Sequence, residues 1–356
     1  MRRREFSLDL ASPLSTARGR IERREGVLVG LDADGVRGVG EATPLPGWTE
    51  SLDDCRAALD AVSATEHGAF DALGDPADPL ADAPPAVTDP LGDAPAARHA
   101  VEGALLDAAG RRRGRSLAAL LADDPASTVP VNATLGDASA EETVAAAIDA
   151  VDAGFSCLKV KVGVGGLDRD VTRLRAVRAA VGPEVTLRAD ANGAWDRETA
   201  REAVAALATL DLAYLEQPLP ADDLSGHAAL RGRGVDVALD ETLAATSLAA
   251  ALDAGAADVL ILKPMALGGP GRTYRGAMAA REANVDPVVT TTIDAAPART
   301  AAVHVAAAIP DVRPCGLATG GALEADLAAD PAPVERGSVD VPDGPGVAGA
   351  AFDDLV

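Results

Sequence analysis

The chain has 356 residues, of which 48% are hydrophobic and 2% aromatic, so a core must be built mainly from Ala, Val and Leu. This length allows one eight-stranded barrel of about 250 residues with roughly 100 left over, so we expect two domains. A net charge of -23 argues against nucleic acid or an anionic membrane as a partner.

The same composition bears on the compartment. No run of 18 apolar residues occurs, the basic N-terminus leads into no apolar signal core, and the three cysteines lack metal-binding spacing. These features predict a cytoplasmic protein. The acidic excess with only three lysines favours a cytoplasm of molar salt, where screening to about 3 Å removes the self-repulsion.

The first third of the chain has the pattern of an α+β module, which we place at residues 1–125. Residues 4–31 alternate as two strands separated by the turn-rich SPLSTARG, and residues 35–45 predict a third strand. Helical periodicity covers 51–64 and 97–121. The Pro- and Asp-rich stretch at 74–95 predicts a poorly ordered acidic surface loop.

From residue 126 to 325, short apolar runs alternate with helical stretches. This pattern predicts an α/β fold, a (β/α)7β TIM-type barrel rather than an open sheet. Residues 326–356 lose the pattern and are expected to return to the N-terminal module as short strands. The candidate strands lie at 129–136, 156–163, 185–193, 213–219, 235–241, 257–264, 287–294 and, as the weakest pattern, 312–320.

One polar residue stands at the end of each of several consecutive candidate strands. The steps from Lys161 to Asp190, Glu216, Asp240 and Lys263 are 29, 26, 24 and 23 residues, each about one strand-plus-helix unit. Parallel barrels build their sites from strand ends in this way. Three carboxylates brought together would repel one another, so we predict a divalent cation there, Mg²⁺ with Mn²⁺ as the alternative.

Three lysines among 32 basic residues also indicate chemistry, because arginine serves wherever a plain positive charge is enough. Lys159 and Lys161 alternate on one strand and so point to the same face, the barrel interior. Two ammonium groups so close disfavour joint protonation, and a lowered pKa would make one amine a base. Lys263 is expected across the interior from them.

Several motifs resemble the muconate-lactonizing subgroup of the enolase superfamily. They are KVK at 159–161, ADANGAW at 189–195, LEQPL at 215–219, DET at 240–242 and LKPMALGG at 262–269, with PLSTARG, GEATPLPGW and VPDGPGVAG outside the barrel. The resemblance covers nearly the whole chain. It implies that the N-terminal module is a capping domain, completed by the C-terminal segment, over the mouth of the barrel.

The resemblance also implies roles. Asp190, Glu216 and Asp240 would hold the cation, Lys161 would abstract a proton α to a carboxylate, and Lys159 would lower the pKa of Lys161. Lys263 would stabilise the enediolate from the opposite face. The remaining candidates are Asn192 and Glu241, as residues that orient ligands, and Trp48 and the loop at 13–24, as a cover over a small-molecule carboxylate substrate. Arg23 or Arg24 would pair with the substrate, although a purely structural role is equally open.

Within the subgroup, PLPGW after GEA, the LKPMALGG form and TTTID resemble the o-succinylbenzoate synthases. Thr291, Thr292 and Asp294 stand where that family often has Ser and Glu, so the contacts there depart from its pattern. N-acylamino-acid racemases and dipeptide epimerases are the alternative, although CGLATG lacks the acidic pair usual in epimerases. A Schiff-base aldolase and a non-catalytic barrel are rival classes, and the oligomeric state, a homo-oligomer included, stays open.

Overall fold

The computed structural model describes residues 1–16, 19–33, 35–65 and 74–356. The chain begins with an antiparallel sheet of three strands in the order β1 (Arg2–Thr16), β2 (Gly19–Ala33) and β3 (Val36–Ala42). Strand β1 continues through part of the stretch expected to be a turn, with a register shift between Asp9 and Leu14. Residues 17 and 18 of the expected capping loop lie outside the described residues.

The described residues after this sheet form four helices: α1 (Leu52–Ser63), α2 (Pro85–Thr88), α3 (Pro95–Arg113) and α4 (Leu117–Leu121). Helix α3 is buried along most of its length and packs directly on β3. The contact needs glycine on the strand, since a Cβ at Gly40 would come within 1.9 Å of the Ala100 carbonyl oxygen. Gly114, in the left-handed conformation, ends α3 and divides the single helix expected at 97–121.

The prediction of a poorly ordered loop at 74–95 is wrong for the packing of this stretch. Leu80, Val87 and Leu91 are each at most 2% exposed and belong to the core that α3 shares with the sheet. Asp78 forms ion pairs with Arg98 and Arg275. The composition of the segment does not predict this packing, because three well-spaced apolar residues suffice to anchor an otherwise polar segment.

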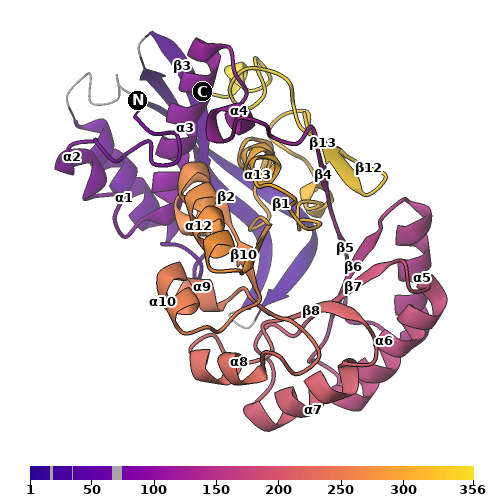
Figure 1. The fold of residues 1–356 in the computed structure, drawn as a ribbon. Helices are drawn as coiled ribbons and strands as arrows, with labels where there is room; N and C mark the ends of the chain where they lie inside the picture. Colours follow the sequence, from indigo (N-terminus) through magenta and orange to yellow (C-terminus); the bar gives the residue numbers. More distant parts are fainter. Residues whose placement is uncertain (17–18, 34, 66–73) are drawn as a thin grey trace.

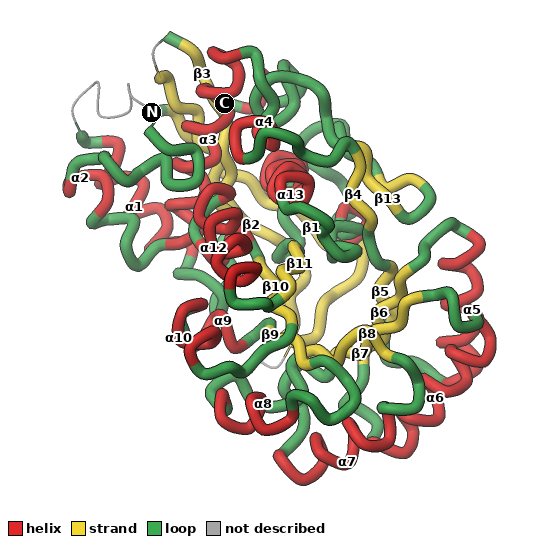
Figure 2. The backbone as a smooth tube through the Cα atoms, in the orientation of Figure 1, coloured by secondary structure: helices red, strands yellow, loops and turns green. Residues whose placement is uncertain are grey.

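The second sheet is parallel and has seven strands in the order β11-β10-β9-β8-β7-β6-β5. Figure 2 shows the sheet curling into an arc with helices along its outer side. Its strands match seven of the predicted ones. They are β5 (Ala133–Leu135), β6 (Cys157–Lys161), β7 (Thr186–Asp190), β8 (Leu212–Glu216), β9 (Val237–Leu239), β10 (Val259–Leu262) and β11 (Asp286–Val289).

Helices between these strands cover the sheet. A box in which Ser139 and Glu142 each bond the other's backbone N–H starts α5, and the Asp196 side chain caps α7. The helices are α5 (Ala140–Asp152), α6 (Leu167–Val181), α7 (Arg197–Leu207), α8 (Leu224–Leu230), α9 (Thr242–Ala245), α10 (Leu248–Asp253), α11 (Pro264–Leu267), α12 (Pro270–Glu282) and α13 (Ala296–Ala308).

The eighth strand expected at 312–320 is not a regular strand. Cys315 and Gly316 instead form isolated parallel bridges with Val131 and Thr290, close to the two edge strands of the sheet. Gly316 suits this position because a Cβ there would approach the Thr290 side-chain oxygen to 2.6 Å. A short 3-10 helix, η1 (Gly320–Ala322), follows.

The C-terminal segment contacts both parts of the molecule. Its strand β12 (Val334–Glu335) pairs with β13 (Ser338–Asp340), and β13 pairs with β4 (Thr128–Pro130), which precedes β5, and not with the N-terminal sheet. The return to the N-terminal module comes after them, where Gly346 bridges to Ser116 and the Val347 N–H bonds to Asp107. Figure 1 shows this last, yellow part of the chain beside α4.

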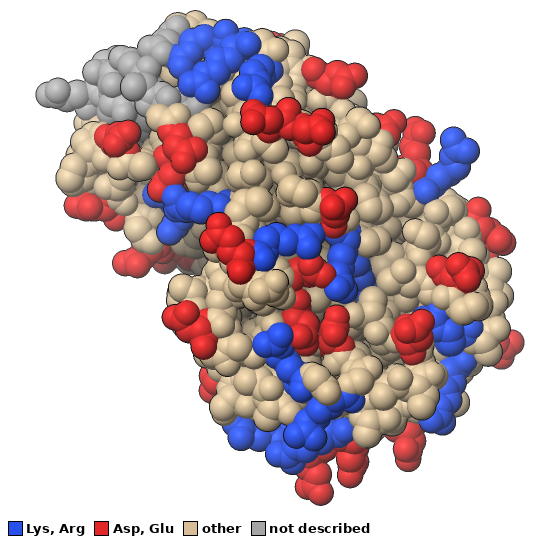
Figure 3. Space-filling model, viewed as in Figure 1, with Lys and Arg blue, Asp and Glu red and all other residues tan. Residues whose placement is uncertain are grey.

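Charge is distributed over the surface without one dominant basic region on the visible face, where acidic and basic side chains alternate (Figure 3). None of the helices in the described part of the chain combines the length and apolar character needed to cross a bilayer.

Candidate active site

Five charged residues stand in a row at the carboxyl ends of five neighbouring strands. Lys161, Asp190 and Glu216 end β6, β7 and β8, and they are paired with one another across the parallel ladders. Asp240 and Lys263 directly follow β9 and β10. The row therefore runs lysine, three acids, lysine, in the order that the sequence spacing predicted.

The lysines contact the acids directly. The Lys161 Nζ lies 2.7 Å from Asp190 Oδ2 and 2.8 Å from Asn192 Oδ1. Lys159 is one layer deeper and bridges two acids, with its Nζ 2.8 Å from Glu216 Oε1 and 3.1 Å from Asp190 Oδ2. Both lysines thus reach the same carboxylate, as their alternation on β6 requires.

At the other end of the row, Lys263 binds Asp240 through both carboxylate oxygens, each 2.7 Å from its Nζ. The ring of Trp48 covers this ammonium group, with its centroid 3.2 Å from the Nζ. Trp48 belongs to the loop that follows β3 of the N-terminal module. The module therefore contributes an aromatic wall to the site.

The three acids offer an all-oxygen donor set but are not gathered into one cluster. Among the described residues, no three His, Cys, Asp or Glu side chains are arranged so that they could hold a metal ion as they stand. The lysine ammonium groups make the contacts to the carboxylates in this arrangement. One observation fits a cation nonetheless: Glu216 Oε2 is buried and has no hydrogen-bond partner.

Burial and neighbouring charge shift the acidities in opposite directions along the row. Burial and the Asp190 charge raise the pKa of Glu216 to about 7, and burial, only partly offset by Lys263, raises that of Asp240 to about 6. Burial opposes ionisation of Asp190 too, but Lys159 and Lys161 outweigh it and lower its pKa below the ordinary value.

Lys159 behaves differently from the expectation that crowding lowers a lysine pKa. Burial disfavours its ammonium group, but the Glu216 and Asp190 carboxylates outweigh burial, and its pKa lies well above the ordinary value. The nearest charges decide the shift, and for Lys159 these are acids. The alternation of Lys159 and Lys161 in the sequence shows that the two lysines are close to each other, but not which acids lie beside them.

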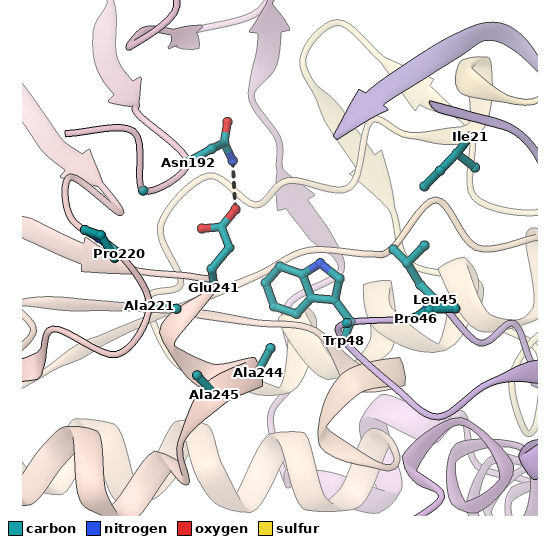
Figure 4. Close-up of a pocket in the computed structure, with 12 residues that line it drawn as sticks. Ile21, Leu45, Pro46, Trp48, Asn192, Pro220, Ala221, Glu241, Ala244 and Ala245 are labelled. Atoms are coloured by element: carbon teal, nitrogen blue, oxygen red, sulfur yellow. Dashed lines mark hydrogen bonds between the residues drawn. The ribbon is translucent and has the colours of Figure 1, made fainter. Parts of the chain in front are cut away.

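A cavity of about 350 Å³ opens beside this row. Asn192 and Glu241 line it, and the Asn192 amide donates to Glu241 Oε1 at 2.9 Å (Figure 4). Leu45, Pro46 and Trp48 form the facing wall from the N-terminal module. Glu241 Oε2 is buried without a partner. The cavity thus joins an apolar wall to a polar edge, an arrangement typical of small-molecule sites.

Sequence reasoning missed Gln217, which holds two strand ends together. Its Oε1 accepts hydrogen bonds from the backbone N–H of Asp240 and Thr242, at 3.0 and 3.2 Å. Its Nε2 donates to the Leu219 carbonyl and the Thr242 hydroxyl, each at 2.9 Å. A polar amide directly after a buried acid, within the apolar LEQPL, was the available signal.

Arg24 is not among the residues that line the cavity. It is 4% exposed and donates to three backbone carbonyls, those of Thr43, Pro44 and Ile293. The sequence left two roles open for Arg24, substrate binding and a purely structural one. Its contacts fit the structural role. Arg23, the other candidate, is exposed and pairs with Asp9.

The side chains that follow β11 also bond mainly to other residues of the protein. Thr291 bonds to the Thr319 hydroxyl at 2.8 Å, and the Thr292 hydroxyl donates to Asp294, which is 1% exposed. Ile293 between them has a φ of 62°, which is rare for a β-branched residue. Strained backbone of this kind concentrates near functional sites, and Asn192 and Gln217 share it with φ of 45° and 40°.

Comparisons with known proteins agree with this architecture. Residues 142–354 match the family described as "Enolase C-terminal domain-like", and residues 2–122 match "Mandelate racemase / muconate lactonizing enzyme, N-terminal domain". A dipeptide epimerase from Methylococcus capsulatus, solved with Mg and the dipeptide L-Arg-D-Lys, superposes with a TM-score of 0.80 at 28% identity, covering 98% of each chain.

Two curated relatives are similar in sequence. An o-succinylbenzoate synthase from Thermobifida fusca is 40% identical over 208 residues, 57% of this chain, and the match spans only 63% of the synthase. Muconate cycloisomerase 1 from Pseudomonas putida is 30% identical over 71% of this chain and 68% of its own length. With both family models and the row of lysines and acids in agreement, the chain belongs to the enolase superfamily as a member of its mandelate racemase and muconate lactonizing enzyme family, and it is an enzyme.

Proposed function

We propose that this enzyme removes a proton from the carbon α to a carboxylate of a small-molecule substrate. The observation that carries the proposal is the row itself, in which Lys161 and Lys263 stand at the two ends of three acids. A proton α to a carboxylate is very weakly acidic, so its removal needs a base on one side and positive charge for the enediolate. A row with an amine at each end provides both.

Asp190, Glu216 and Asp240 would hold Mg²⁺, or Mn²⁺ as the alternative, which supplies positive charge beside the substrate carboxylate. The unpartnered Oε2 of Glu216 is the buried atom that such a ligand set would use. The Methylococcus epimerase, solved with Mg, supports the assignment. Lys159, Lys161 and Lys263 all contact these acids in the structure, so the carboxylates would exchange some of these contacts for the ion.

Among the residues of the chain, Lys161 takes the α-proton on its Nζ, while Asn192 and Asp190 hold that nitrogen. Lys263 keeps its proton and places its ammonium group beside the developing negative charge on the opposite side. Trp48 covers Lys263 and excludes water from it. Asn192, Glu241 and Gln217 keep the strand ends in register.

The specific reaction we propose is that of o-succinylbenzoate synthase in menaquinone biosynthesis. The substrate would be 2-succinyl-6-hydroxy-2,4-cyclohexadiene-1-carboxylate, and Lys161, once protonated, would assist loss of hydroxide on the same face. Similarity to the Thermobifida synthase supports this choice. So does CGLATG at 315–320, which lacks an acidic pair to bind a substrate amino group.

Racemisation of N-acylamino acids or epimerisation of dipeptides is the second candidate. The Methylococcus epimerase favours it, because the likeness extends over 98% of both chains. In this case Lys161 and Lys263 would act on opposite faces, one removing the proton and the other returning one. The shared first step explains why one row of residues suits both reactions.

One pair of assays separates these candidates. The enzyme with Mg²⁺ in concentrated salt would be given the cyclohexadiene substrate, and aromatisation would be followed by absorbance. In parallel, N-succinyl amino acids and dipeptides in D₂O would be followed by NMR for α-deuterium exchange and inversion. We expect aromatisation to dominate. Inversion without aromatisation would replace the synthase by the racemase or epimerase, and neither activity would contradict both.

A further inference from the structure

Lys161 is held at its backbone as well as at its amine. Strand β5 ends at Leu135, which is paired with Val160, so the neighbouring strand stops one residue short of Lys161. The guanidinium group of Arg173, on α6, takes the place of the missing strand residue as a hydrogen-bond donor. Its Nη1 donates to the Lys161 carbonyl at 3.1 Å. A side chain thus supports β6 at the residue where its neighbouring strand stops.

Arg173 gathers several other groups around the same point. Its side chain is only 1% exposed, and its Nη2 donates to the Gly136 carbonyl just beyond β5 at 3.0 Å. The Nη1 also lies 2.9 Å from Asp170 and 3.0 Å from Asp137, and the Nε donates to the Thr143 hydroxyl at 3.3 Å. One buried cation therefore fixes the ends of β5 and β6 to the helices that flank them.

Asp170 extends this support to the residues after Lys161. Its Oδ2 accepts the Gly163 N–H at 2.7 Å. Gly163 has a φ of 93°, and a Cβ there would lie 2.7 Å from the Ala194 Cβ, so the chain at this turn has little freedom. Between the two anchors, the Val162 N–H bonds to the Asp190 carbonyl at 2.9 Å. The backbone is held on both sides of the point where Lys161 leaves the strand.

A second arginine of the same helix supports the opposite ends of the strands. Arg178 donates to the carbonyls of Gly182 and Val185, just before β7, and of Leu210 and Asp211, just before β8. Arg178 thus bonds four backbone carbonyls and Arg173 two, at opposite ends of neighbouring strands of the same sheet. Only Arg173 is connected to the end that carries the row of lysines and acids.

We propose that Arg173 is a positioning residue for Lys161. It sets the direction in which the Lys161 side chain leaves β6, and so keeps the Nζ between Asp190 and Asn192 where it can reach the α-carbon. The inference rests on the proposed role of Lys161 in proton transfer. Arg173 is a buried residue of the outer helix layer, and it would act on Lys161 through the backbone carbonyl of that residue without touching the substrate.

The kinetic test compares Arg173→Met with Arg178→Met as the matched control. We expect Arg173→Met to lower kcat by about tenfold to a hundredfold with little change in KM, because a small displacement of a reacting group costs rate rather than binding. Arg178→Met should lower the melting temperature and leave kcat unchanged. Arg173→Lys, which keeps a donor near the Lys161 carbonyl, should recover part of the rate. Equal loss of kcat in both methionine variants would overturn the proposal.

A second measurement does not depend on the substrate. The chain has only three lysines, with side chains 33% exposed for Lys161, 16% for Lys159 and 10% for Lys263, so amine labelling can be resolved by peptide mass spectrometry. Arg173→Met should raise the labelling rate of Lys161 relative to Lys263, and Arg178→Met should not. An unchanged ratio would contradict the proposal. If the wild type turns over none of the substrates, the proposed reaction fails while labelling still decides the role of Arg173.

Loss of a buried cation could also unfold the protein, because Asp170 would be left without its partner. The double variant Arg173→Met/Asp170→Asn removes that unpaired charge. The amide oxygen of the new asparagine side chain can still accept the hydrogen bond from the Gly163 N–H. We expect this variant to recover thermal stability while kcat stays low. Recovery of kcat together with stability would show that Arg173 is structural only.

Discussion

Two groups of buried carboxylates in this enzyme are held in different ways. At the strand ends, Asp190, Glu216 and Asp240 contact lysine ammonium groups. At the junction between the N-terminal module and the domain of the seven-stranded parallel sheet, Glu41 and Glu102 accept backbone N–H groups instead. The first arrangement keeps movable charges beside a cavity, whereas the second fixes helices.

The junction contacts are specific. Glu41 on β3 accepts the N–H groups of Ala295 and Ala298 at the start of α13, each at 2.9 Å. Glu102 on α3 accepts those of Gly271 and Arg272 at the start of α12, at 2.7 and 3.2 Å. Neither helix has a side-chain cap of its own. Acids from one domain thus cap two helices of the other, where the helix dipole favours negative charge.

This comparison is tested most strongly by Lys161→Ala. If the strand-end contacts serve chemistry, removal of the amine should lower kcat by roughly a thousandfold, within the range for loss of a general base. The variant should still bind the metal, which a metal titration would check. Residual activity within about tenfold of the wild type, a barrier change under about 1.4 kcal/mol, would contradict the role of Lys161.

A smaller loss is expected for Asp240→Asn. The amide keeps the size of the side chain but removes the charge, so activity should fall by roughly a hundredfold and the Mg²⁺ concentration for half-maximal rate should rise. Excess Mg²⁺ should restore the rate only in part. Activity and Mg²⁺ dependence equal to those of the wild type would exclude Asp240 as a ligand.

At the junction, Glu102→Gln should change the pH dependence of stability. Burial, partly offset by Arg98, raises the pKa of Glu102 to about 7 from an ordinary value of 4.5. Between these values the folded protein keeps a proton that the unfolded chain releases, so stability falls as pH rises through this window, by roughly 3 kcal/mol in all. Above pH 7 there is no further loss.

The glutamine variant lacks this titration but keeps an acceptor for Gly271 and Arg272. Thermal unfolding of both proteins from pH 4.5 to 8 in constant salt isolates the effect. The wild type should lose stability relative to Glu102→Gln up to about pH 7. A difference independent of pH would show that Glu102 titrates as an exposed acid does.

The smallest effect is expected at the aromatic cover. Trp48→Leu removes the ring over Lys263, which should cost roughly 1 kcal/mol, or about fivefold in kcat/KM. Trp48→Phe should lose less, because a smaller ring still faces the ammonium group. If the leucine variant matches the wild type in steady-state kinetics, the contact between Trp48 and Lys263 does not contribute to the transition state.

The parts of this structure that the sequence predicted are those that periodicity encodes. Seven parallel strands and the order of Lys161, Asp190, Glu216, Asp240 and Lys263 along them follow from spacing and alternation. The eighth strand was expected from a pattern, but Cys315 and Gly316 form only single bridges. An isolated bridge involves only one pair of residues, so it produces no alternating pattern from which the sequence could predict it.

The other misses concern long-range polar contacts. Arg24 binds carbonyls from two distant segments, Gln217 joins two strand ends, and Arg173 reaches the Lys161 carbonyl from a helix. In the sequence these are single polar residues among many, and their partners are backbone atoms with no residue signature. Such contacts become visible only when the coordinates bring the segments together.

The capping of α12 and α13 by Glu102 and Glu41 bears on how related enzymes can be recombined. A chimaera that joins the parallel-sheet domain of this enzyme to the N-terminal module of a relative loses Glu102 and Glu41, the acceptors for the first N–H groups of α12 and α13. Such a fusion therefore needs an acid introduced at both positions of the new module. Without these acids, the two domains are not interchangeable between relatives.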